Sequence, residues 1–174
     1  MSGVSKAIVQ PLLSWYDAGH RDLPWRSEPA PYRVWVSEIM LQQTRVEAVR
    51  GYFSRWMNAL PDIPALAAAD EAVYTKLWEG LGYYSRVRNL HRAAILLCEE
   101  YGGELPADYD RLLALPGVGE YTAGAVASIA FGLPVPAVDG NVLRVAARLD
   151  NDFTPITDAK FKKQTRERFA ALMP

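Results

Sequence analysis

The sequence has only one cysteine, Cys98, among its 174 residues. A single cysteine excludes an internal disulfide, and it excludes any multi-cysteine metal site built from this chain alone. It also fits a reducing compartment, where disulfides rarely persist. We therefore expect this chain to hold no metal through its own residues.

Long apolar runs are absent as well. The longest uncharged stretch, Tyr121 to Val138, contains two glycines and two prolines, so it predicts a buried helix followed by a loop. The N-terminal residues do not combine a basic start with an apolar run, which argues against a secretion signal. We expect a soluble protein with no membrane partner, in the cytoplasm of a bacterium or the nucleus of a eukaryote.

The sequence also lacks an excess of positive charge. It contains 19 lysines and arginines against 20 aspartates and glutamates, for a formal net charge of −1. Proteins that bind duplex DNA usually carry a basic surplus. The segment from Gly80 to Cys98 has three arginines and no acid, which leaves room for one basic face. A solvated helix face is the alternative interpretation of the same charges.

No segment shows a convincing strand pattern, whereas helical spacing of apolar residues recurs along the chain. Asp70, Asp108 and Asp158 stand where helix N-caps are expected, Gly102-Gly103 ends a helix, and Pro61 and Pro64 break another. The sequence therefore predicts an all-α fold. The predicted helices are Ile8 to Tyr16, Tyr32 to Leu41, Val46 to Leu60, Ala72 to Leu81, Val87 to Tyr101, Tyr109 to Leu115, Thr122 to Phe131, Asn141 to Leu149 and Ala159 to Met173.

A glycine-rich turn is the most specific local signal. Leu115-Pro116-Gly117-Val118-Gly119 falls between two predicted helices, so it predicts a tight inter-helix hairpin. Gly117 and Gly119 permit positive φ and let the backbone approach a partner closely. The N–H groups at the start of the next helix would suit a phosphate oxygen and, with hairpin carbonyls, a monovalent cation. A plain corner between two helices is the alternative.

Two carboxylates have surroundings that should push their pKa values apart. Glu38 lies in a helix that is apolar over most of its circumference, so desolvation should favour its protonated form. Asp139 precedes a predicted helix start, where backbone N–H groups and the helix dipole favour the ionised form. A protonated acid and a fixed carboxylate are the pair that glycosidic bond cleavage needs. A structural N-cap and an exposed helical glutamate are the alternatives.

Four motifs together resemble MutY-type adenine DNA glycosylases of the helix-hairpin-helix superfamily. They are Trp35 to Thr44, Gly80 to Tyr84, the hairpin, and Val138 to Val142, in the family's order and at similar spacing. The resemblance implies a helical bundle at 20–135 with the helix-hairpin-helix at 109–131, and a second helical domain from 1–19 and 136–174. It implies a monomer that binds double-stranded DNA containing an adenine mispair, in the cleft between the domains, and removes adenine opposite 8-oxoguanine or guanine.

The resemblance also assigns catalytic roles. Glu38 is the acid that protonates adenine at N7, and Asp139 is the carboxylate that supports the sugar cation. Endonuclease III-like relatives place a nucleophilic lysine where this chain has Tyr121. The chain is therefore expected to release the base without cutting the strand, with Tyr121 packing on the sugar or hydrogen-bonding a catalytic carboxylate. A packing residue at a helix start is the alternative for Tyr121.

Recognition residues follow from the same resemblance, because chemistry on a stacked base requires its extrusion from the duplex. Gln43 and Thr44 resemble the wedge that fills the gap, with Gln42 before them as a further substrate-binding residue. Tyr83 with Leu81 resembles the pair that probes the opposite base. A polar helix end and an ordinary turn aromatic are the alternatives. The remaining expected contacts are adenine-pocket residues Trp25 and Arg26, substrate-binding Asn141, and phosphate-binding Gly117, Val118 and Gly119.

The chain departs from the resembling family where it ends. Complete relatives continue into four cysteines that hold a four-iron four-sulfur cluster, and then into a further domain that helps identify 8-oxoguanine. We therefore expect a truncated product whose second domain is incomplete and leaves the apolar residues of Ala159 to Met173 poorly covered. A noncatalytic DNA-binding fragment, or a glycosylase for another mispaired base, stays open as an alternative function.

Overall fold

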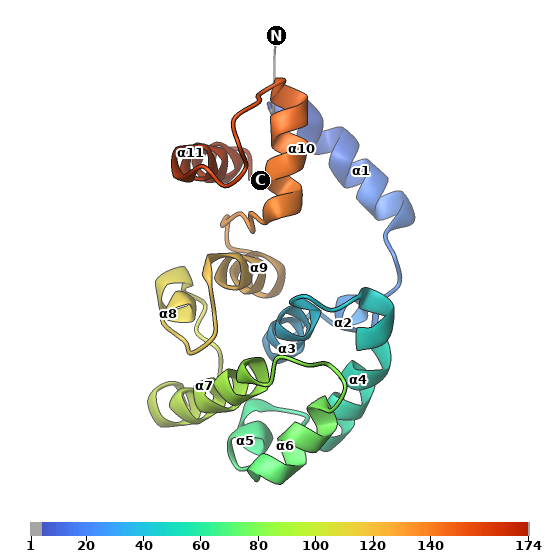
Figure 1. Ribbon diagram of the computed structural model, residues 1–174, viewed down its shortest axis with the longest axis vertical. Coiled ribbons are helices and arrows are strands. Elements are labelled where there is room, and N and C mark those ends of the chain that lie inside the picture. Colours follow the sequence, from blue (N-terminus) through green and yellow to red (C-terminus); the bar gives the residue numbers. More distant parts are fainter. Residues whose placement is uncertain (1–4, 174) are drawn as a thin grey trace.

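The structure, a computed structural model, describes residues 5–173, and all its regular elements in this range are helical (Figure 1). The predicted all-α fold is confirmed. None of the described helices is both long and apolar enough to cross a membrane. The elements are η1 (Lys6–Ile8), α1 (Val9–Gly19), α2 (Pro24–Ser27), α3 (Pro31–Leu41), α4 (Val46–Ala59), α5 (Ile63–Ala67), α6 (Glu71–Trp78), α7 (Ser85–Tyr101), α8 (Tyr109–Leu113), α9 (Glu120–Phe131), α10 (Gly140–Asp150) and α11 (Ala159–Ala170).

All nine predicted helices are present, and two short helices, α2 and α5, were missed. Pro64 was expected to break a helix, but it lies in the first turn of α5. Proline is tolerated there because the first N–H groups of a helix have no intrahelical partner. The Asp62 carboxylate caps α5 by accepting a hydrogen bond from the Ala65 N–H at 2.8 Å. The predicted break is present, because α4 ends at Ala59 before Pro61, but the new helix that begins beside Pro64 was not expected.

Two of the three predicted aspartate caps are formed. The side chains of Asp108 and Asp158 accept hydrogen bonds from the N–H groups of Arg111 at 2.9 Å and Phe161 at 2.8 Å. Asp70 occupies the N-cap position of α6, but its side chain makes no capping hydrogen bond. The predicted helix starts at α8 and α11 thus have the expected physical cause.

The hydrophobic core is built around three fully buried tryptophans. Trp56 and Trp78 meet edge to face, with ring centroids 5.6 Å apart, and Trp35 lies on α3. Two of the polar groups in this core are paired: the Trp56 indole N–H donates to the Tyr32 hydroxyl at 3.0 Å, and that hydroxyl donates to the Leu60 carbonyl at 2.9 Å. The buried Trp35 indole N–H has no hydrogen-bond partner among the described residues. This core fixes α3, α4 and α6 relative to one another.

Helix α9 is made of small residues, and this allows two segments to approach it closely. It packs directly against α3, and the chain after it crosses back over its surface. A Cβ added at Gly124 would lie 2.8 Å from the carbonyl oxygen of Pro136. The segment that leads to Asp139 is therefore held against α9 by the absence of a side chain at position 124.

Helices α1, α10 and α11 lie apart from the α2–α8 bundle, with α9 between the two groups (Figure 1). Phe161 of α11 is buried, while Phe169, Leu172 and Met173 line a small apolar cavity together with residues of η1 and α1. The apolar residues of Ala159 to Met173 are therefore partly covered, whereas they were expected to be poorly covered. Residues 1–4 and 174 of the predicted second domain lie outside the described residues.

The close approach at Gly124 predicts a loss of stability on substitution. Gly124→Ala should lower the free energy of unfolding by about 1–3 kcal/mol, because the added methyl group meets backbone that cannot rotate away. Chemical denaturation measures this change. Gly19→Ala is the matched control, since no atom lies within 4 Å of a Cβ at Gly19. Equal stability of the two variants would contradict the packing argument.

Candidate active site

Glu38 lies on the face of α3 that turns toward a cavity of about 730 Å³. Burial raises the pKa of its carboxyl group above the ordinary value of 4.5. A hydrogen bond with Tyr121 and the charge of Arg26 act in the opposite direction on this pKa, while the charge of Asp139 adds to the increase. The protonated form is therefore favoured, as the apolar helix predicted.

Asp139 is held at the N-cap of α10 by three donors. One carboxylate oxygen accepts hydrogen bonds from the N–H groups of Asn141 and Val142, both at 2.9 Å. The other accepts from the Asn141 side-chain amide at 2.7 Å, and the carbonyl oxygen of that amide accepts from Arg144. Donors at a helix N-terminus stabilise negative charge, so this carboxylate is fixed in orientation and suited to face a cation.

Tyr121 stands between the two carboxylates. It lines the cavity that contains Glu38 and also a second cavity, of about 580 Å³, that contains Asp139 and Gly119. Burial and the nearby charges of Glu38 and Asp139 raise the pKa of its hydroxyl group, which therefore stays protonated and donates to Glu38. Of the two arrangements expected for Tyr121, the structure has the hydrogen bond to a carboxylate.

The larger cavity also contains the two expected adenine-pocket residues. Trp25 is buried edge to face against Phe53, with ring centroids 5.3 Å apart. The Arg26 guanidinium lies 5.5 Å from the centroid of the Tyr16 ring, so α1 contributes to this wall. Sequence reasoning missed the other members of this wall because no local pattern brings them together. They include Tyr16, Arg21, Leu41, Val46 and Ile129.

Asn141, which was predicted to bind substrate, contacts two parts of this site. It lines the larger cavity with Glu38, and its amide side chain is bonded to Asp139. Its contacts within the protein make it a support for the Asp139 carboxylate. Gln42 lines the smaller cavity, where its side chain donates to the Thr122 hydroxyl at 3.3 Å.

The predicted wedge and probe residues lie on two neighbouring loops. Gln43 and Tyr83 are both exposed, Tyr83 to 65%, and their φ angles are 57° and 47°. Residues other than glycine rarely adopt this left-handed conformation, and those that do concentrate at functional sites. Thr44 is half-buried beside Gln43. Leu81 is only 6% exposed and belongs to the core, so in this structure it does not present its side chain to a partner base.

The two hairpin glycines have different roles, contrary to the sequence expectation. Gly117 has a φ of 77°, and a Cβ there would lie 2.7 Å from the Asn89 Cβ, so both conformation and space require glycine. Gly119 has an ordinary φ of −95° and open space around it. The Val118 N–H already donates to the Leu115 carbonyl at 3.1 Å, so it is not available to a phosphate. The predicted monovalent cation site stays a prediction.

An iron–sulfur cluster does not fit the residues of this chain. Four thiolates hold such a cluster, and the single thiol, Cys98, is half-buried next to Gly103. Among the described residues, no group of three or more histidine, cysteine, aspartate or glutamate side chains could hold a metal ion.

Comparison with known families gives one match over most of the chain. Residues 36–171 match the HhH-GPD superfamily of base excision DNA repair proteins. The chain belongs to this superfamily. The matched range of the HhH-GPD model contains Glu38, Tyr121 and Asp139, and it begins after Trp25 and Arg26.

Curated relatives of this HhH-GPD chain carry the name adenine DNA glycosylase. The chain is 52% identical to the Mus musculus protein over 147 residues, which are 79% of this chain and 28% of that protein. It is 43% identical to the Mycolicibacterium smegmatis protein over 164 residues, 94% of this chain and 55% of that protein. The chain thus spans between about a quarter and just over half of these relatives.

Solved structures agree with the superfamily assignment. A thermostable thymine-DNA glycosylase superposes with a TM-score of 0.88 at 28% identity, covering 97% of this chain and 78% of that one. A non-covalent endonuclease III–DNA complex gives a TM-score of 0.79 at 26% identity, covering 98% of this chain and 79% of that one. The helix-hairpin-helix glycosylase fold predicted from sequence is confirmed.

Burial of Glu38 predicts a pH-dependent stability difference. The pKa of Glu38 in the folded state is raised above 4.5. The contribution of Glu38 to the free energy of unfolding is therefore complete below its pKa in the unfolded state, and it is lost as the pH rises through its pKa in the folded state. Glu38→Gln removes this loss. The variant should therefore gain stability relative to the native chain as the pH rises above the ordinary Glu pKa of 4.5, and chemical denaturation at a series of pH values measures this gain.

Glu99→Gln is the control, since Glu99 is an exposed carboxylate on α7. Its stability difference from the native chain should change little over the same range. A Glu38→Gln difference that stayed constant with pH would show that burial does not raise the Glu38 pKa.

Proposed function

We propose that this chain is the catalytic part of an adenine DNA glycosylase that removes adenine opposite 8-oxoguanine or guanine in double-stranded DNA. The observation that carries the proposal is the arrangement of one half-buried carboxyl group, whose pKa burial raises, and one capped carboxylate on either side of Tyr121. The names of relatives sharing 43–52% identity support adenine as the base. A mammalian relative with that name, from Homo sapiens, is 50% identical over 147 residues.

Glu38 supplies the proton in this mechanism. An extruded base in the larger cavity lies beside Glu38, Trp25 and Arg26, and it becomes a better leaving group once its ring nitrogen is protonated. The N-glycosidic bond then breaks and its electron pair stays on the base. The proton from Glu38 neutralises the negative charge that the base would otherwise carry. The Tyr121 hydroxyl donates to Glu38 and so stabilises the carboxylate that remains.

Asp139 supports the sugar after the base departs. Its oxygens are oriented by Asn141 and Val142, so no rearrangement is needed to place negative charge near a cationic sugar. Water adds to the anomeric carbon, and its proton passes to a carboxylate of the pair. The products are free adenine and an abasic site. Tyr121 offers no amine, so the strand is not cut through a Schiff base at this position.

The smaller cavity can receive the sugar-phosphate backbone. It contains Gly119 and the start of α9, together with Lys162 and Arg166 of α11. Arg166 forms an ion pair with Glu120 in the first turn of α9, and this pairing offsets the negative charge of Glu120. Open space at Gly119 and a helix N-terminus suit a phosphate oxygen. A DNA strand bound here would place its sugar near Asp139.

The first test replaces each carboxylate with its amide. Glu38→Gln and Asp139→Asn should each lower single-turnover release of adenine by about 100-fold or more, because each removes a charge or proton that the transition state needs. DNA binding should be largely retained, since phosphate contacts supply most of it. Glu99→Gln serves as the matched control. Near-normal excision by either variant would remove that residue from the mechanism.

The same assay separates the alternative functions. A noncatalytic fragment would bind the duplex and release no base with the native chain. Because one similar structure is a thymine-DNA glycosylase, duplexes carrying mispaired thymine belong in the substrate panel.

Borohydride should trap no covalent DNA adduct; any trapping should be tested with Lys162→Ala, because Lys162 lines the Asp139 cavity.

The second test concerns the hairpin. Gly119→Val should weaken binding to all duplexes alike, because its side chain would fill the open space offered to a phosphate. The fold should survive, since φ at Gly119 is −95° and no atom lies within 4 Å of the added Cβ. Melting temperature and equilibrium binding measure the two effects. Unchanged affinity would place the phosphate contact elsewhere.

A further inference from the structure

Arg86 occupies the space between the two loops that carry the exposed residues Gln43 and Tyr83. It lies in the first turn of α7 and is half-buried. One neighbour is the wedge loop, residues 42–45, which follows α3. The other is the probe loop, residues 79–84, which joins α6 to α7. These loops are far apart in sequence, and one guanidinium group contacts both.

On the wedge-loop side, Arg86 binds the end of α3. Its Nη1 donates to the carbonyl oxygens of Ile39 at 3.0 Å, Met40 at 3.1 Å and Gln42 at 2.5 Å. Carbonyls in the last turn of a helix lack intrahelical N–H partners. A positive charge at this position also opposes the negative end of the α3 dipole. Arg86 therefore terminates α3 and fixes the backbone immediately before Gln43.

On the probe-loop side, the other terminal nitrogen acts in the same way. The Nη2 of Arg86 donates to the carbonyl oxygens of Leu81 at 2.9 Å and Gly82 at 3.2 Å. Its guanidinium carbon lies 5.2 Å from the Trp78 ring centroid and 5.8 Å from the Tyr83 ring centroid. The backbone immediately before Tyr83 and the Tyr83 ring are thus both in contact with Arg86.

The backbone strain in the two loops points to the same residue. The non-glycine residues with positive φ at these loops, Gln43 and Tyr83, each directly follow a carbonyl that Arg86 binds. Such conformations persist only where the surroundings hold them. Because one planar group with parallel donors supplies both contacts, a shift of one loop is transmitted to the other.

We propose that Arg86 is a positioning residue that couples Gln43 to Tyr83, so that the side chain entering the DNA and the side chain meeting the opposite base act as one unit. The proposal rests on the proposed function for the identity of the DNA. A lysine is not equivalent to this arginine, because its ammonium group is one point charge, whereas the two terminal nitrogens of the guanidinium group donate to different loops. Arg86 touches neither the reacting base nor the sugar in this scheme.

A double-mutant cycle measures this coupling directly. Gln43→Ala, Tyr83→Ala and the double variant are compared for equilibrium binding to a duplex carrying adenine opposite 8-oxoguanine. In the native background, the fold-loss of affinity in the double variant should differ from the product of the fold-losses in the two single variants by about threefold or more. In an Arg86→Lys background, the two losses should simply multiply. A merely structural role for Arg86 would lower stability and leave this coupling unchanged.

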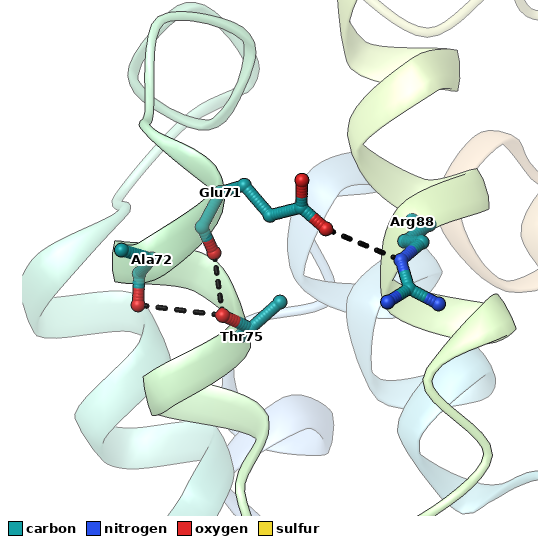
Figure 2. A network of polar contacts seen from close by, with 4 residues as sticks. All are labelled: Glu71, Ala72, Thr75 and Arg88. Atoms are coloured by element: carbon teal, nitrogen blue, oxygen red, sulfur yellow. Dashed lines mark hydrogen bonds and ion pairs between the residues drawn. The ribbon is translucent and has the colours of Figure 1, made fainter.

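Arg88→Lys is the matched control. Arg88 lies on the same helix two residues away, but its Nε donates to the Glu71 carboxylate of α6 at 3.2 Å, away from both loops (Figure 2). Glu71 also accepts a hydrogen bond through its backbone carbonyl from the Thr75 hydroxyl (Figure 2). The coupling between Gln43 and Tyr83 should survive Arg88→Lys, which removes an arginine of α7 without changing the charge.

Each outcome of the cycle decides the proposal. Equal coupling in the native and Arg86→Lys backgrounds would overturn it. If Arg86→Lys fails to fold, the cycle is repeated in an Arg86→Gln background, where one amide group replaces the two terminal nitrogens and the two losses should again multiply. Multiplicative losses in the native background would show that the loops are not coupled. The readout is binding, so a chain that binds but releases no adenine would refute the proposed chemistry alone. A native chain that binds no duplex would contradict both.

Discussion

The close packing of α9 against two segments is the constraint on which the candidate site depends. Helix α9 meets α3 on one side, and the chain before α10 crosses it at Gly124, where a Cβ would lie 2.8 Å from the Pro136 carbonyl. Glu38, Tyr121 and Asp139 come from α3, α9 and the α10 N-cap, and they meet only because these segments are close. A larger residue at position 124 would separate the groups that the chemistry requires.

The two carboxylates differ because the fold gives them opposite surroundings. Glu38 lies where burial raises its pKa, and Asp139 lies where backbone N–H groups donate to it. Tyr121 connects them as a donor to Glu38 that is also close to the charge of Asp139. Keeping a carboxyl group partly desolvated reduces stability at neutral pH, and this is the usual relation between stability and activity at catalytic sites.

Backbone strain is also present in the wedge loop and the probe loop. Gln43 and Tyr83 hold left-handed backbone conformations that cost about 1–3 kcal/mol each. The hydrogen bonds of Arg86 to both loops offset this strain. The surface that would meet DNA is therefore not a flexible loop region, because its exposed side chains stand on backbone fixed from beneath.

Most of the helices, the hairpin and the local surroundings of Glu38 and Asp139 could be predicted from the sequence alone. These features depend on neighbours within a few residues: apolar spacing along α3 and α7, the glycine at 117, and the helix start that follows Asp139. Helices α2 and α5 were missed because four or five residues give little periodic signal, whereas α8, which is as short as α5, lies within the longer apolar segment Tyr109 to Leu115.

The folded structure was needed to show which residues share a surface. It placed Leu81 in the core, brought Tyr16 to the cavity of Glu38, and set Arg86 against carbonyls 44 to 47 residues away in sequence. It also separated the roles of the hairpin glycines, since only Gly117 faces Asn89. Such contacts depend on how helices pack against one another, and packing between distant segments leaves no local pattern in the sequence.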